Sequence, residues 1–166
     1  MAILSLPKQS RLSDTSAVIH SIDAEQWVPR PIDEVFVFFS DAFNLESITP
    51  PRVHFHVITS RPIELKSGAL INYKMRLNGI PLKWTTRIET WDPPHEFSDI
   101  QLSGPYKLWS HTHTFSTKNG GTTMTDHVDY ELPLGPLGEL VHKAWVRRDV
   151  ESIFAYREKI IRERFS

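Results

Sequence analysis

Hydrophobic and polar residues alternate along two stretches of the chain, residues 104–115 and 123–130, and this period-2 alternation predicts two β-strands. One side of each strand mixes large apolar side chains with titratable ones. On the first strand this side carries Trp109, His111, His113 and Phe115, and on the second it carries Met124, Asp126, Val128 and Tyr130. A closed core is normally apolar, and a solvated face would not hold this much aromatic surface. A concave, mostly apolar pocket with a few inward polar groups explains the mixture.

Other segments carry signals for strands, turns and short helices. Further strands are predicted at 17–28, 53–59, 69–77, 82–91 and 97–102. Pro31 followed by two acidic residues begins a helix, and Asp41 caps a second short helix that ends before Pro50. Asn78-Gly79 is a strong hairpin signal. Together these signals predict one strand, two short helices, six further strands and a C-terminal helix.

The C-terminal segment is helical from Gly138, but its apolar stripe changes direction along the helix. The first half presents Leu137, Leu140, Val141, Ala144 and Trp145, and the second half presents Val146, Val150, Ile153, Phe154, Ile160 and Ile161 on nearly the opposite side. One interpretation is a bend near residues 147–149, or two helices. The other is that the first half faces a partner, which includes a homodimer formed through this helix.

Composition narrows the class of protein. The 166 residues are enough for one domain, which we place at 17–166 after a flexible lead-in at 1–16. Nineteen basic residues against 20 acidic ones leave no electrostatic footprint for nucleic acid. The sequence has no apolar run long enough to span a membrane and no signal-peptide pattern. With no cysteine there is no disulfide or thiolate chemistry, and we expect a cytoplasmic protein.

The order of elements resembles a known superfamily. The segment 31–36, the segment 41–45, and the run from Phe97 through Tyr106 and Phe115 to Asp126 resemble the START-like, or SRPBCC and Bet v 1-like, superfamily, in particular a bacterial polyketide cyclase/dehydrase-like branch. This resemblance implies an α+β helix-grip fold, in which a seven-stranded antiparallel curved sheet wraps around a long C-terminal helix. It also implies an internal hydrophobic cavity between sheet and helix. It carries over no catalytic residue.

His111, His113 and Asp126 are the candidate catalytic residues. The two histidines point the same way from one strand, and Asp126 lies roughly opposite them on the next. Three interpretations remain open: a buried polar cluster that only satisfies itself, an acid–base pair, or a metal site. A second His-x-His pair, His54 and His56, is expected to face outward because Phe55 belongs to the apolar side. No zinc, nucleotide or P-loop motif is present, so we predict no metal and no cofactor.

The remaining candidates would form the pocket wall. Asp99 and Gln101 share a side of their strand with Phe97, so they face the pocket if Phe97 does; otherwise Asp99 is solvated. Arg157 lies in the apolar arc of the last helix, where it would pair with Asp126 or Asp99, anchor an anionic ligand, or reach solvent. The full set of predicted ligand-binding residues is Tyr73, Trp84, Asp99, Gln101, Tyr106, Trp109, Phe115, Met124, Tyr130, Phe154 and Arg157.

Three functions fit these patterns. The first is binding of a hydrophobic small molecule, such as a lipid, polyketide or aromatic compound, in the internal cavity. The second is a cyclase or dehydratase that uses a His–Asp acid–base pair in the same cavity. The third is a protein-interaction module that uses the first half of the C-terminal helix.

Overall fold

The structure is a computed structural model of the 166-residue chain, and it describes residues 18–77 and 79–166. The predicted lead-in at 1–16 and the turn residue Asn78 lie outside this part. Seven strands form one antiparallel sheet in the order β1-β7-β6-β5-β4-β3-β2. Their bounds are β1 His20–Val28, β2 His56–Val57, β3 Leu70–Leu77, β4 Ile80–Asp92, β5 Glu96–Ser103, β6 Leu108–Lys118 and β7 Gly121–Glu131. The predicted helix-grip fold is therefore confirmed.

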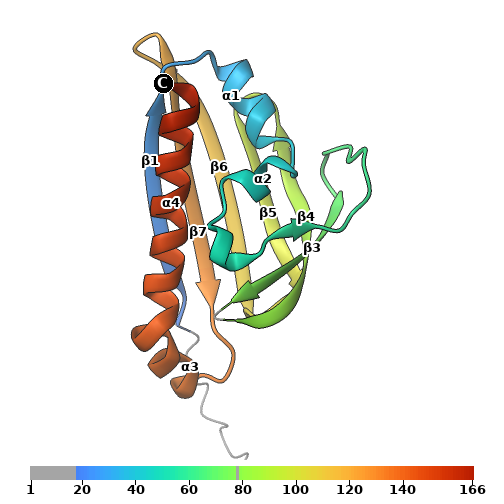
Figure 1. The fold of residues 1–166 in the computed structure, drawn as a ribbon, viewed down its shortest axis with the longest axis vertical. Helices are drawn as coiled ribbons and strands as arrows, with labels where there is room; N and C mark the ends of the chain where they lie inside the picture. The colour runs from blue at the N-terminus through green and yellow to red at the C-terminus, as the bar shows by residue number, and fades with distance from the viewer. Residues whose placement is uncertain (1–17, 78) are drawn as a thin grey trace, which may run out of the picture.

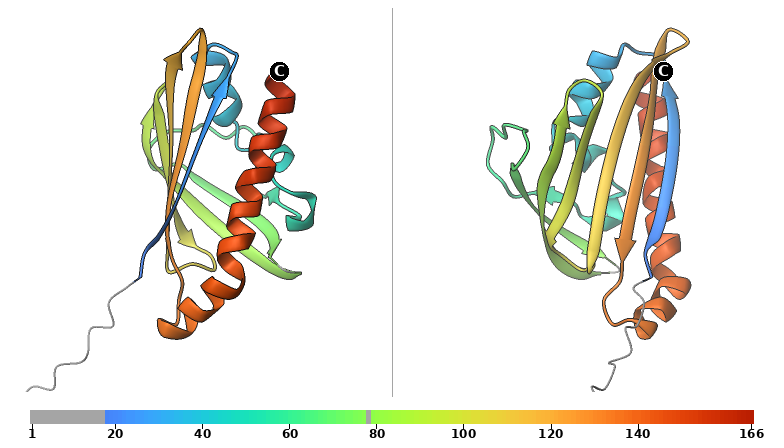
Figure 2. Two further views of the ribbon diagram at one scale, coloured as in Figure 1. Left: turned by 90° about the vertical axis from the view of Figure 1, so that its left-hand side faces the viewer. Right: turned by 180° about the vertical axis from the view of Figure 1, so that it is seen from behind.

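All helices that touch the sheet lie on the same side of it. The helices are α1 Ile32–Phe39, α2 Asn44–Ser47, the 3-10 turn η1 Pro51–Val53, α3 Pro136–Val141, the π-helical turn η2 His142–Val146 and α4 Arg147–Phe165. Seen along the sheet, α1, α2 and α4 stand on one face, and from behind the other face is bare (Figures 1 and 2). A sheet covered on one face alternates apolar-in and polar-out, which is the pattern that the sequence displays.

The π-helical turn η2 is the local cause of the change in direction of the apolar stripe along the C-terminal helix. A π turn holds one residue more than an α turn, so it rotates the side chains that follow by roughly 100°. Leu137 and Leu140 before it are exposed, as is Trp145 within it; after it, α4 buries one regular stripe. That stripe is Val150, Phe154, Arg157, Ile161 and Phe165. The predicted change of direction is confirmed, as an insertion within one continuous helical segment. No helix in the described residues is long and apolar enough to cross a bilayer.

The strand predicted at 53–59 is wrong in most of its length. Pro51 begins the 3-10 turn η1, and His54 adopts a positive φ of 45°, which ends any extended run there. Pairing with β3 is limited to His56 and Val57. His54 and His56 are exposed, as expected, and His56 lies 3.5 Å from Glu46. This edge of the sheet is therefore short, and the segment around it closes over the pocket side.

Candidate functional site

A pocket of about 160 Å³ opens between the concave face of the sheet, the short helices and α4. Much of its wall is aromatic or aliphatic. Trp84, Trp109 and Tyr106 lie at one side, where Trp84 and Trp109 meet edge to face at 5.4 Å between ring centroids. The polar side chains in its wall include Thr49, Thr86, Asp99, His111, His113, Asp149 and Arg157. The predicted combination of apolar bulk and a few inward polar groups is thus present in one cavity.

The strand register brings the two histidines and two aspartates together. His113 pairs directly with Asp126 across β6 and β7, and Asp99 pairs with His111 across β5 and β6. His111 Nε2 lies 3.0 Å from Asp126 Oδ1. His113 Nδ1 lies 2.6 Å from the same oxygen, although it is not aligned as a regular hydrogen bond. Asp126 therefore supports both rings from behind, on the side away from the pocket.

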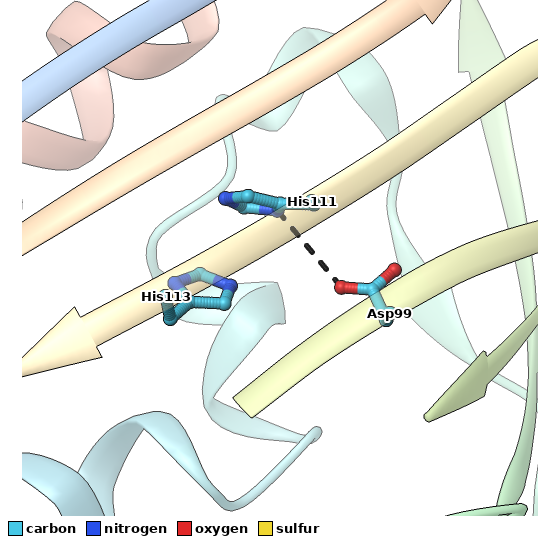
Figure 3. A group of neighbouring side chains, drawn as sticks. All are labelled: Asp99, His111 and His113. Carbon is cyan, nitrogen blue, oxygen red and sulfur yellow. Dashed lines mark ion pairs between the residues drawn. The ribbon is translucent and has the colours of Figure 1, made fainter. Parts of the chain in front are cut away.

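Asp99 faces the same cluster from β5. Its Oδ2 lies 4.0 Å from His111 Nδ1, and its Oδ1 accepts a hydrogen bond of 3.2 Å from Thr86. Thr86 in turn accepts from Trp84 Nε1 at 3.1 Å, so a chain of donors on β4 holds one carboxylate oxygen. Figure 3 shows both rings rising from β6 with the Asp99 carboxylate directed at His111. The alternative in which Asp99 is solvated is thereby excluded.

Burial sets the protonation of this cluster. Burial lowers the pKa of His111 to about 4, and the neighbouring His113 adds to this, so His111 is neutral at pH 7. Burial alone would raise the pKa of Asp126, but His113 and His111 outweigh it and hold that pKa well below its usual range. Burial raises the pKa of Asp99, against the opposing influence of His111 and Thr86. Two carboxyls in one cluster thus have opposite tendencies, which is typical of sites that separate an acid from a base.

Arg157 is buried beside this cluster without the ion pair that the sequence suggested. In residues 18–77 and 79–166, neither Asp99 nor Asp126 lies within ion-pair distance of it. Its Nε and Nη1 have no hydrogen-bond partner, and its guanidinium carbon lies 4.9 Å from the centre of the Phe154 ring. Burial lowers its pKa, with Asp126 and Asp99 opposing that effect. A buried guanidinium with free donors in a pocket wall is suited to an anionic group.

Four of the predicted ligand-binding residues do not line this pocket. Phe115 and Met124 pack into the core between α1 and the end of α4. Tyr130 is buried by Val150 and Phe154, and its hydroxyl lies 2.8 Å from His142 Nε2. Gln101 donates to the backbone oxygen of Tyr106 at 2.6 Å, so it holds that loop in place. Phe115, Met124 and Tyr130 share a face with the pocket residues, but the helices cover them further along the sheet.

Other wall residues were missed because they come from outside the alternating strands. The pocket is also reached by residues of α1, α2, the turn between them, the segment after α2 and the connection before β3: Phe39, Ala42, Leu45, Thr49 and Leu65. The hydrogen bond from Thr86 to Asp99 was also not predicted. A period-2 pattern assigns faces within a sheet, whereas it says nothing of which helix lies over them.

No family model matches the sequence, and no curated protein matches it either. Solved structures do match in fold. The protein TTHA0849 from Thermus thermophilus is 20% identical with a TM-score of 0.65, over 86% of this chain and 97% of that one. Norcoclaurine synthase from Thalictrum flavum, a point mutant with a transition state analogue, is 14% identical with a TM-score of 0.63, over 91% and 99%. The chain has the Bet v 1-like, helix-grip fold.

A further match extends this likeness to a two-domain protein. The ARO/CYC protein StfQ of the steffimycin biosynthetic pathway is 12% identical with a TM-score of 0.67, over 87% of this chain and 50% of that one. The helix-grip domain here therefore corresponds to one half of a di-domain protein. At these identities the likeness establishes the fold, while function has to be argued from the pocket.

Proposed function

We propose that this helix-grip protein binds a small hydrophobic molecule that carries one anionic or strongly polar end. The observation that carries the proposal is the composition of the pocket wall. Aromatic rings of Trp84, Trp109 and Tyr106 form its apolar side, and Asp99, His111, His113 and Arg157 form one polar wall. Such a division fixes the orientation of an amphipathic ligand.

The size of the pocket limits the ligand. At about 160 Å³ it is close to cavities of about 150 Å³ that hold benzene, so a compact body of one or two rings suits it better than a long chain. The free donors of Arg157 favour a carboxylate or enolate at the polar end. A ring-sized acid is therefore the class that we expect.

Binding of 2-naphthoate and of its neutral amide tests this class. The acid is expected to quench the fluorescence of Trp84 and Trp109, and Trp109→Ala to weaken its binding by about tenfold or more because a buried aromatic contact is lost. Trp145→Ala is the matched control, since Trp145 is exposed and outside the pocket. Equal affinity of the two variants would contradict the proposed site.

A second variant tests the polar end separately. Arg157→Met removes the charge and leaves an unbranched side chain that fills part of the same space. The protein should then no longer bind 2-naphthoate more tightly than its amide. A preference for the acid that survives this change would place the anionic end elsewhere. Thermal unfolding of each variant shows whether a loss of binding follows from a loss of fold.

An acid–base enzyme of the cyclase or dehydratase kind is the second candidate. It is favoured by the opposite pKa tendencies of Asp99 and Asp126 around a neutral His111 that faces the pocket. In this function His111 Nδ1 takes a proton from the bound molecule, and Asp126 stabilises the imidazolium that forms. A turnover that is unchanged in both His111→Gln and His113→Gln would exclude it.

A further inference from the structure

We propose that Asp99, His111 and His113 bind a divalent transition metal ion such as zinc at the polar end of the pocket. One ligand atom from each of the three residues lies within 4.8 Å of the other two. Two imidazoles and one carboxylate form the three-ligand set of zinc sites that keep an open coordination position. The sequence alone predicted no metal because no zinc motif is present, and the metal site that it left open had Asp126 rather than Asp99 as the acidic ligand.

The hydrogen bonds of the cluster leave the right atoms free. Asp126 accepts from His111 Nε2 at 3.0 Å, which places the proton there and leaves a lone pair on Nδ1, facing Asp99. His113 turns Nδ1 toward Asp126 and so keeps Nε2 for a ligand. Thr86 occupies Oδ1 of Asp99, and Oδ2 faces His111. Each of the three residues thus offers one atom to the others, while its second atom is hydrogen-bonded or, in His113, directed at Asp126.

This arrangement matches the support that metal-binding histidines receive in proteins. Such histidines usually donate their second ring nitrogen to a carboxylate, which fixes the tautomer and the ring orientation. Asp126 has this place for His111, and the same oxygen lies 2.6 Å from His113 Nδ1. His113 is further held by stacking on Phe97, with ring centroids 4.3 Å apart. Zinc ligands lie about 3.3 Å from one another at tetrahedral geometry, so the side chains need to draw together by up to about 1.5 Å.

Arg157 provides an independent observation that points to a ligand. It is 9% exposed, it lines the same pocket, and two of its donors are unpartnered. With both aspartates ionised, a divalent ion and the guanidinium leave a net positive charge in the cavity. An anionic group on the bound molecule neutralises it by occupying the open position of the metal near Arg157. The inference shares the pocket of the proposed function, but it does not depend on which organic molecule binds.

Metal titration of the purified, chelator-treated protein tests the site. Cobalt(II) is the probe, because its visible absorption reports tetrahedral nitrogen and oxygen ligation, and zinc should displace it. We expect one ion per chain. Asp99→Asn and His113→Gln should each weaken binding by about 100-fold or more, and Thr86→Val by about tenfold, as for a residue that orients a ligand. The double variant His54→Gln/His56→Gln removes the exposed His-x-His pair and should leave binding unchanged.

The outcomes separate the metal site from the carrier function. A cobalt affinity that Asp99→Asn leaves unchanged, or that the His54/His56 variant abolishes, overturns the site. Adding 2-naphthoate should alter the cobalt spectrum, and an unaltered spectrum contradicts an open position facing the pocket. If 2-naphthoate binds but cobalt does not, the metal proposal alone fails. If cobalt binds at Asp99 and His113 but 2-naphthoate does not, the proposed carrier function alone fails.

Discussion

Asp126 and His127 are neighbours on β7, yet they belong to two histidine–aspartate clusters on opposite faces of the sheet. Asp126 lies inside with His111 and His113. His127 lies outside, where its Nδ1 is 2.7 Å from Asp23 and its Nε2 is 3.3 Å from Asp129. Both clusters pair imidazoles with carboxylates on adjacent strands. The distances are similar and the main difference is exposure, although the inner cluster also holds a second histidine.

The two clusters shift histidine in opposite directions. Hydrogen bonding to Asp23, with help from Asp129, raises the pKa of His127, because water still solvates the imidazolium. Burial lowers the pKa of His111 to about 4 although Asp126 and Asp99 lie beside it. Close carboxylates therefore do not make a histidine basic when its charged form has to leave water. The inner cluster is a neutral imidazole supported by a charge, which is what a ligand or a metal site requires.

Removing the inner carboxylate is the strongest way to test this contrast. Asp126→Asn should destabilise the fold by about 2 kcal/mol, because the buried ring nitrogens of His111 and His113 lose their charged carboxylate partner. Urea unfolding measures the change. A decrease in the free energy of unfolding of less than about 1 kcal/mol would mean that Asp126 contributes no more to stability than an exposed ion pair does.

Titration of the histidines by NMR gives the second test. His111 is expected to titrate near pH 4 and His127 above 6.5. Since the folded pKa of His111 is below its unfolded value, its contribution to stability is full above pH 6.5 and is lost as pH falls toward 4. The contribution of His127 is present below 6.5 and is lost as pH rises through its folded pKa. Similar pKa values for His111 and His127 would contradict the conclusion that burial separates them.

Opening the inner cluster to water should reduce the difference between the pKa values of His111 and His127. Phe154 covers His111 edge-on, with ring centroids 5.8 Å apart. Phe154→Ala is expected to raise the pKa of His111 toward its ordinary value, because part of the burial is removed. The same NMR titration detects it, with His127 as the internal control. An unchanged pKa of His111 would show that its neighbours, rather than burial, set its value.

Substitution in the outer cluster should have the smallest effect on stability. Asp129→Asn is expected to change the free energy of unfolding by less than about 0.5 kcal/mol, because exposed ion pairs are compensated by solvent. Added salt should shrink even this difference, whereas it should leave the effect of Asp126→Asn nearly unchanged. A salt-sensitive Asp126→Asn would indicate that water reaches the inner cluster.

The sequence by itself determined the faces of the strands and the order of the elements. Alternation placed Trp109, His111 and His113 inward, because side chains on a strand point to opposite faces in turn. The helical periodicity of the C-terminal segment also showed that its apolar stripe changes side, which happens at the π-helical turn. The strand predicted at 53–59 was wrong in most of its length, because the 3-10 turn that begins at Pro51 and the positive φ of His54 do not show in the alternation of side chains.

Only the tertiary structure decided which inward residues share the pocket. Phe115 and Met124 have the same alternation as Trp109, but α1 and the end of α4 cover them. Register and curvature brought Asp99 against His111, and Thr86 against Asp99, across three strands. A linear pattern records which side of a sheet a residue faces. The position of the covering helices and the offset between strands depend on packing across the whole molecule, and these fixed the site.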